Sequence, residues 1–145
     1  MRTTGLVFLI SYTVCLSTAS AQATDRDTQA IQEVIENAYV KGVFIDRNAP
    51  AVRSGFHPAF VLSVYDADTV IVASLDMWLD LLQLSGERSS DSVRHVFEGV
   101  DVTGGTATVK LQLWINDEHV YTDYLGLYRF PDGWKIVTKV FASHD

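Results

Sequence analysis

The sequence has a single cysteine, Cys15, which lies in an apolar stretch near the N-terminus. Such a chain has no disulfide framework, and its predicted folded part has no thiol nucleophile. The four histidines are scattered, without the HxH or HxxxH spacing that is typical of metal sites. Neither a glycine-rich phosphate loop nor a G-x-S-x-G motif is present. We therefore predict no metal site and no cofactor.

Positive charge is also scarce. The chain has 11 lysines and arginines against 18 acidic residues, which gives a formal net charge of −7, and the basic residues form no cluster. Nucleic acids and anionic membrane surfaces are bound mainly through clustered positive charge. We therefore expect neither of them as a partner.

Residues 1–23 have the composition of a signal peptide. Met1-Arg2 is a short positive start, Gly5 to Leu16 is apolar, and small residues around Ala21 and Ala23 suit cleavage after either alanine. The apolar run is too short for a stable membrane anchor. We predict export to the periplasm or secretion, with an uncleaved anchor as the alternative. Residues 24–145 are then long enough for a single domain with its own core.

The order of predicted elements places the helices before most of the strands. Apolar residues at helical spacing predict a long helix over about 27–46, and Asn48 and Ser74 are suited to cap two shorter helices ending near Gly55 and Leu84. Alternating or β-branched runs predict strands over 60–65, 69–73, 93–102 and 107–116 and a hairpin over 121–141. This order predicts an α+β fold.

The hairpin from Tyr121 to Phe141 is the most informative stretch. Its turn, Pro131-Asp132-Gly133, is predicted as a three-residue loop. Both faces of the hairpin are half apolar, so we expect it at the centre of a sheet that is covered on both sides. The loop predicts that Phe130 pairs with Trp134, Tyr128 with Ile136, Leu125 with Lys139, and Asp123 with Phe141.

Several short motifs resemble those of one superfamily. They are Tyr39 and Gly42 near the end of the first helix, Asp46, Phe56-His57-Pro58, Asp123-Tyr124-Leu125-Gly126-Leu127, Asp132-Gly133-Trp134-Lys135-Ile136-Val137 and Lys139-Val140-Phe141. With the order of elements, they resemble the nuclear transport factor 2-like superfamily and, within it, the lumazine-binding group, relatives of the polyketide-cyclase-like and ketosteroid-isomerase-like proteins. The resemblance implies a cone-like, curved, mixed or antiparallel sheet wrapped around a long N-terminal helix and two shorter ones. It also implies a pocket at the wide end of the cone and frequent homodimers.

Candidate site residues come from polar and aromatic side chains that such a cone would enclose. Asp123, His57 and Lys139 are the candidates for acid–base catalysis, although the sequence favours a cross-strand Asp123–Lys139 ion pair and a structural role for His57 over catalysis. The ligand-binding candidates, which could also be core or dimer residues, are Tyr39, Tyr65, Trp114, Tyr124, Tyr128 and Trp134.

Three functions remain open from the sequence. The first is an exported protein that binds a small, partly aromatic molecule in the cone. The second is an isomerase, cyclase or hydratase that uses an Asp, His or Lys acid–base group in the same pocket. The third is a non-catalytic module that dimerises through the sheet face carrying Lys110, Gln112 and Trp114.

Overall fold

The computed structural model describes the backbone of residues 17–144 and the side chains of residues 24–144. Most of the predicted signal peptide lies outside the described residues. Residues 17–23 form the first part of helix α1 (Ser17–Val34). Within the described part of the chain, none of the helices combines the length and apolar character needed to cross a membrane.

The long N-terminal helix changes its winding halfway. Helix α1 runs directly into the π-helical segment η1 (Ile35–Ile45), so the helix predicted over 27–46 is confirmed, but with a wider second half. Its end has the wider pattern of hydrogen bonds, because the Asp46 amide donates to the Lys41 carbonyl at 2.7 Å. π-Helical turns are rare and often occur at functional sites.

The two shorter helices begin at the predicted caps. Helix α2 (Ala49–Gly55) starts after Asn48, whose side chain accepts a hydrogen bond from the Ala51 amide at 3.0 Å. Helix α3 (Leu75–Leu82) starts after Ser74, whose hydroxyl accepts one from the Met77 amide at 3.3 Å. Both bonds satisfy amides that the first turn of a helix leaves free.

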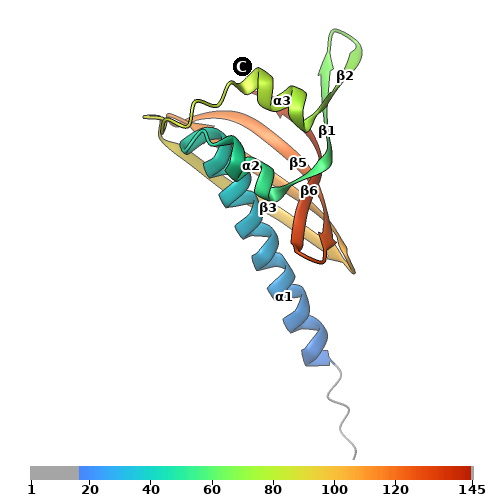
Figure 1. Cartoon of the computed structure of the whole chain (residues 1–145). Helices are drawn as coiled ribbons and strands as arrows, with labels where there is room; N and C mark the ends of the chain where they lie inside the picture. The colour runs from blue at the N-terminus through green and yellow to red at the C-terminus, as the bar shows by residue number, and fades with distance from the viewer. Residues whose placement is uncertain (1–16, 145) are drawn as a thin grey trace, which may run out of the picture.

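Six strands form one curved, unclosed sheet in the order β2-β1-β6-β5-β4-β3. Their bounds are β1 (Phe56–Asp66), β2 (Thr69–Ser74), β3 (Val93–Thr103), β4 (Thr106–Ile115), β5 (Glu118–Phe130) and β6 (Gly133–Ser143). The β1–β6 pair is parallel and the other pairs are antiparallel. The α+β fold with three helices and a mixed, cone-like sheet is therefore confirmed. The C-terminal part of α1 and the segment η1 lie over one face of the sheet, and the N-terminal part of α1 projects beyond its edge (Figure 1).

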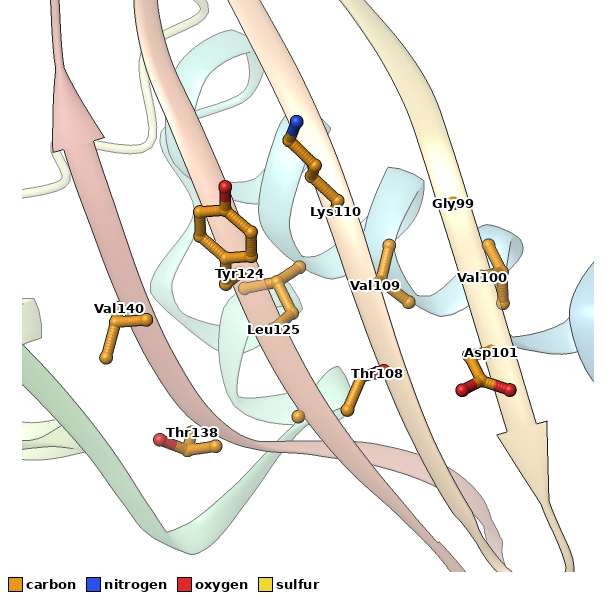
Figure 2. Close-up of a pocket in the computed structure, with 11 residues that line it drawn as sticks. Gly99, Val100, Asp101, Thr108, Val109, Lys110, Tyr124, Leu125, Thr138 and Val140 are labelled. Carbon is orange, nitrogen blue, oxygen red and sulfur yellow. The ribbon is translucent and has the colours of Figure 1, made fainter.

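The core lies between the helices and the inner face of the sheet, the face that carries Leu111, Leu113, Leu125 and Leu127. The opposite, outer face is open, since Tyr124 there is 48% exposed and none of the helices within residues 17–144 covers it (Figure 2). The prediction that both faces are covered was therefore wrong for the single chain. The alternation predicted for β4 is confirmed, because Ala107, Val109, Leu111 and Leu113 are buried in the core and the residues between them are not.

The hairpin register agrees with the prediction at one end only. Its turn has two residues, Pro131 and Asp132, and Leu127 pairs with Ile136. The predicted pairing of Tyr128 with Ile136 and of Phe130 with Trp134 was wrong. A β-bulge that adds Val137 to β6 then restores the predicted register, in which Leu125 pairs with Lys139 and Asp123 with Phe141. The bulge places Trp134 and Ile136 on the inner face.

Gly126 lies next to this bulge and leaves room for it. A Cβ atom at this position would lie 2.6 Å from Thr138 Cγ2, which is shorter than real contacts allow. The strands approach closely here because Gly126 has no side chain.

Candidate functional site

Three polar side chains meet inside the apolar core. The Tyr39 hydroxyl donates a hydrogen bond to Asp123 Oδ2 at 2.7 Å, and Lys139 Nζ lies 2.9 Å from Asp123 Oδ1. The Lys139 ammonium also donates to the Tyr39 hydroxyl. Asp123 is fully buried and Lys139 is 5% exposed. We call Tyr39, Asp123 and Lys139 the triad.

Each member of the triad comes from a different element. Tyr39 lies in the middle of the π-helical segment η1, whereas Asp123 and Lys139 lie on neighbouring strands β5 and β6. The two strand residues are diagonal neighbours, since Leu125 pairs with Lys139 and Asp123 with Phe141. Diagonal neighbours on one face are within reach of a long side chain such as lysine.

Aromatic rings surround the amine of the triad. Lys139 Nζ lies 4.5 Å from the ring centroid of Tyr39, 4.8 Å from that of Phe141, 5.5 Å from that of Tyr121 and 5.8 Å from Trp78. The faces of such rings attract a cation, which partly replaces the water that burial removes. This aromatic shell continues through Phe44, Phe56 and Phe60.

Burial changes the acidity of two triad members in opposite directions. It lowers the pKa of the Lys139 amine, although the nearby Asp123 carboxylate acts against this change. Burial, together with the charge and hydrogen bond of Asp123, raises the pKa of the Tyr39 hydroxyl well above its usual value. Both changes favour uncharged side chains, because the apolar surroundings solvate charge poorly.

The Asp123 carboxylate keeps part of its capacity to accept hydrogen bonds. Its Oδ1 atom is close enough to Lys139 Nζ for an ion pair, but among the described residues it accepts no hydrogen bond of acceptable angle. We regard the contact as an ion pair whose direction is poor for a hydrogen bond. Buried acceptors are normally satisfied, so this oxygen is available to a further donor.

Two hollows approach the triad from the surface. The first, which we call the rim hollow, has a volume of about 430 Å³ and lies between the β1–β2 hairpin and the end of β6, lined by Val64, Tyr65, Asp66, Ile71, Phe141, Ala142 and Ser143. A smaller one of about 190 Å³ is lined in part by Phe44, whose ring contacts Tyr39. Phe141 lines the rim hollow and also lies beside Lys139 Nζ, so the hollow and the aromatic rings around the amine share this side chain.

A third hollow, of about 490 Å³, lies on the outer face. Lys110, Tyr124 and Thr138 line it on the side of the sheet turned away from the helices (Figure 2). It therefore lies across the sheet from the triad. In the described part of the chain, no group of three or more His, Cys, Asp or Glu side chains is arranged to hold a metal ion.

Comparison with known proteins identifies the family. The model of a family described as "Putative lumazine-binding" matches residues 26–142, which is most of the chain. The chain belongs to this lumazine-binding family. The same family was expected from the hairpin and helix motifs, and the match confirms it.

Relatives and solved structures agree with this assignment. The chain is 28% identical to the protein named Aldolase FrzH from a Cladobotryum species over 113 residues, which cover 77% of this chain and 89% of that one. An NTF2-like (nuclear transport factor 2-like) protein of unknown function from Shewanella baltica has a TM-score of 0.71 at 18% identity, covering 83% of this chain and 96% of its own. One from Silicibacter pomeroyi has a TM-score of 0.66 at 17% identity, with coverages of 86% and 98%. These structures show the fold, and fold and family together support a small-molecule-binding domain.

The catalytic candidates of this lumazine-binding family member are only partly brought together. Asp123 and Lys139 meet in the triad, and the predicted cross-strand ion pair is present. His57 is held elsewhere, because its ring stacks on Phe130 at 4.6 Å and accepts a hydrogen bond from the Ala59 amide. The three residues therefore do not form one acid–base site.

The six ligand-binding candidates do not share one site either. Tyr39 lies in the core, Tyr124 and Tyr128 lie on the open outer face, and Tyr65 on the projecting hairpin is 71% exposed. Trp114 stacks on His119, with Arg94 over its ring. Trp134 is buried where its Nε1 donates to Asp27 at 3.2 Å. Tyr124 and Tyr128 occupy even positions of β5, which face away from the odd position that carries Asp123.

The structure adds three residues to the site that the sequence did not single out. Trp78, Tyr121 and Phe141 contribute aromatic rings around Lys139. A signal was present for two of them, since Tyr121 and Phe141 alternate in phase with Asp123 and Lys139. Trp78 belongs to the apolar stripe of α3 and carries no such signal of its own.

Proposed function

We propose that the protein binds a small, partly aromatic organic molecule at the rim hollow, with a polar group of that molecule directed toward the triad. The observation that carries this proposal is the triad itself, which is a charged pair and a hydroxyl sealed by aromatic rings beside a hollow of suitable size.

The energetic cost of the triad supports this proposal. Burying an ion pair costs free energy, and apolar side chains of the same size are often at least as stable in its place. A core that retains both charges therefore suggests a use beyond stability, and buried groups with altered pKa values are concentrated at functional sites. The unused acceptor capacity of Asp123 Oδ1 points in the same direction.

Native mass spectrometry tests the binding proposal. Protein purified from its natural source should retain a small molecule, and purified protein should bind members of a panel of aromatic compounds that includes lumazine. Tyr39→Phe should weaken binding because it removes one polar contact of the triad, whereas Tyr124→Phe on the outer face should not. Equal affinity of both variants would contradict the proposed site.

A second candidate is an enzyme that acts at the same place. The lowered pKa of Lys139 and its contacts with Asp123 and Tyr39 suit proton transfer at a carbon next to a carbonyl group, as isomerases, cyclases and hydratases require. Similarity to a protein named an aldolase favours carbonyl chemistry over binding alone. Exchange of the α-hydrogens of ketones in deuterium oxide, with Lys139→Met as control, tests this function. The same slow exchange with both proteins would count against it.

We also propose that the protein is exported and pairs with a second copy through its outer face. The N-terminal composition supports export, and the open outer face around Tyr124 supports pairing. Mass analysis of protein from its natural source should find a mature N-terminus after Ala21 or Ala23. Light scattering should find a dimer that Trp114→Glu weakens, and a monomeric wild type would refute pairing.

A further inference from the structure

We propose that Lys139 forms an imine with a ligand that carries an aldehyde or ketone group, so that the site takes carbonyl compounds with an aromatic or apolar body. This inference rests on the proposed binding at the rim hollow, and it names the chemical class of the ligand.

The first argument is the position of the amine. Lys139 is one of only four lysines in the chain, the others being Lys41, Lys110 and Lys135. Its side chain is 6% exposed, compared with 40% for Lys110 and 19% for Lys135, and Lys41 is exposed. One lysine therefore has its nitrogen inside an aromatic shell, where an apolar ligand would be bound.

The second argument is the protonation state that the step needs. Only a neutral amine attacks a carbonyl carbon, and an exposed lysine is almost entirely protonated at neutral pH. Burial favours the neutral amine of Lys139, which is the condition under which lysines act as imine-forming nucleophiles. The proton that the ammonium must lose can pass to Asp123 through the Tyr39 hydroxyl, which accepts a hydrogen bond from Nζ and donates one to Asp123 Oδ2.

The step can be written in full with the groups present. Asp123 first removes one proton from the Lys139 ammonium, and the neutral nitrogen then forms a bond to the carbonyl carbon. The carbonyl oxygen takes up a proton, which the Tyr39 hydroxyl can pass on because it touches both Nζ and Asp123. Both hydrogens of the neutral amine end in the water that leaves, and a carbon–nitrogen double bond remains. No oxidant or reductant is consumed.

The path to the amine runs past Phe141. This side chain lines the rim hollow, and its ring centroid lies 4.8 Å from Nζ. For the imine to form, this ring has to turn aside so that a ligand in the hollow meets the amine. Carboxylates would be disfavoured there, because Asp66 lines the rim hollow and Asp123 Oδ1 lies 2.9 Å from the amine. An uncharged carbonyl compound meets neither repulsion.

Trapping with benzaldehyde and sodium cyanoborohydride tests the proposal on the full chain at neutral pH. The reductant converts an imine into a stable benzylamine, which peptide mapping assigns to one of the four lysines. Burial lowers the pKa of the Lys139 amine, so a larger fraction of it is neutral than at an exposed lysine. We therefore expect more label on Lys139 than on any of the other three lysines.

Two variants and one isostere complete the experiment. In Phe141→Ala, which lacks the aromatic ring beside the amine, Lys139 should be labelled faster than in the wild type. In Lys139→Met the dominant benzylated product should be absent. Labelling confined to Lys41, Lys110 and Lys135, or no labelling, would overturn the imine whether or not Lys139→Met folds. Benzyl alcohol has the same body without a carbonyl group, so its binding separates the two proposals. Binding of this alcohol without labelling would leave the proposed function standing, whereas absence of both would remove both.

Discussion

Two lysine–carboxylate pairs lie on opposite faces of the same sheet. Lys139 and Asp123 are buried on the inner face, whereas Lys110 and Glu98 on the outer face have side chains that are 40% and 35% exposed, with Nζ 2.5 Å from Glu98 Oε2. Burial lowers the pKa of Lys139, while the hydrogen bond and charge of Glu98 raise the pKa of Lys110. The pKa values of the two lysine amines therefore shift in opposite directions.

The difference shows that desolvation of the amine, more than the presence of a carboxylate partner, decides the direction in which the lysine pKa shifts. On the outer face water solvates both charges, so the pair costs little and contributes little. On the inner face the pair must replace the lost water by itself, with help from Tyr39 and the aromatic rings. Breaking the inner pair should therefore have much larger consequences than breaking the outer one.

The largest effect is expected from Asp123→Asn. This change leaves the Lys139 ammonium buried without its carboxylate, which should lower the free energy of unfolding by about 3–5 kcal/mol. Urea unfolding followed by tryptophan fluorescence measures the loss. The double variant Asp123→Leu with Lys139→Met removes both charges and should regain most of the stability. If Asp123→Asn unfolded at the same urea concentration as the wild type, burial of the Lys139–Asp123 pair would not make it more important for stability than the exposed pair.

A smaller effect is expected from Gly126→Ala beside the bulge that brings the inner pair into register. The added methyl group would lie 2.6 Å from Thr138 Cγ2, and overpacking of this kind typically costs about 1–3 kcal/mol. Thr138→Ser removes the opposing methyl group, so the double variant should recover stability. If the double variant were no more stable than Gly126→Ala, the clash would not be the cause.

The dependence of stability on pH should separate the two lysines. Below pH 10.5, the usual lysine value, the unfolded chain protonates Lys139 more readily than the folded chain does, so its contribution to stability rises with pH. Above pH 10.0 the raised pKa of Tyr39 acts in the opposite direction, because the folded chain then holds the extra proton. Unfolding should therefore be measured as the pH approaches 10.0 from below.

Two variants serve as matched controls for that measurement. Lys139→Met should flatten the rise in stability relative to the wild type. Lys110→Met should leave the rise unchanged in this range, because a raised pKa keeps Lys110 protonated in the folded chain and its contribution is lost only above pH 10.5. Identical slopes for the wild type and Lys139→Met would show that burial does not control this amine.

The smallest effect is expected from breaking the outer pair. Lys110→Met should shift the urea midpoint slightly, and added salt should shrink even that shift, since exposed ion pairs are screened. Unfolding at low and high salt measures it. A loss as large as that of Asp123→Asn would mean that the outer face is buried in the native assembly.

Much of the fold could be predicted because its signals are local. The caps at Asn48 and Ser74 and the alternation of β4 depend on residues only a few positions apart. The bulge at Val137 could not be predicted in the same way, because it is set by the contact of two strands at Gly126 and Thr138. The error of one position in the register beyond the bulge follows directly from this.

The site residues also divide into those that local sequence patterns predict and those that depend on long-range contacts. Asp123 and Lys139 are close enough in sequence for a hairpin register to predict their contact, and the prediction of an ion pair was confirmed. Tyr39 is 84 positions from Asp123, and no periodicity indicates that its hydroxyl would reach that carboxylate. His57 and the outer tyrosines were grouped with the site because of residue type, which carries no information on where a side chain points.

The sequence by itself therefore determined the α+β class, the helix starts, the central hairpin and the family, because these depend on short-range patterns of polarity and backbone preference. Only the tertiary structure decided which residues form the triad and which lysine side chain is buried and desolvated. Both depend on how the π-helical segment packs on the curved sheet, and burial, the physical cause of the altered pKa values, exists only after that packing.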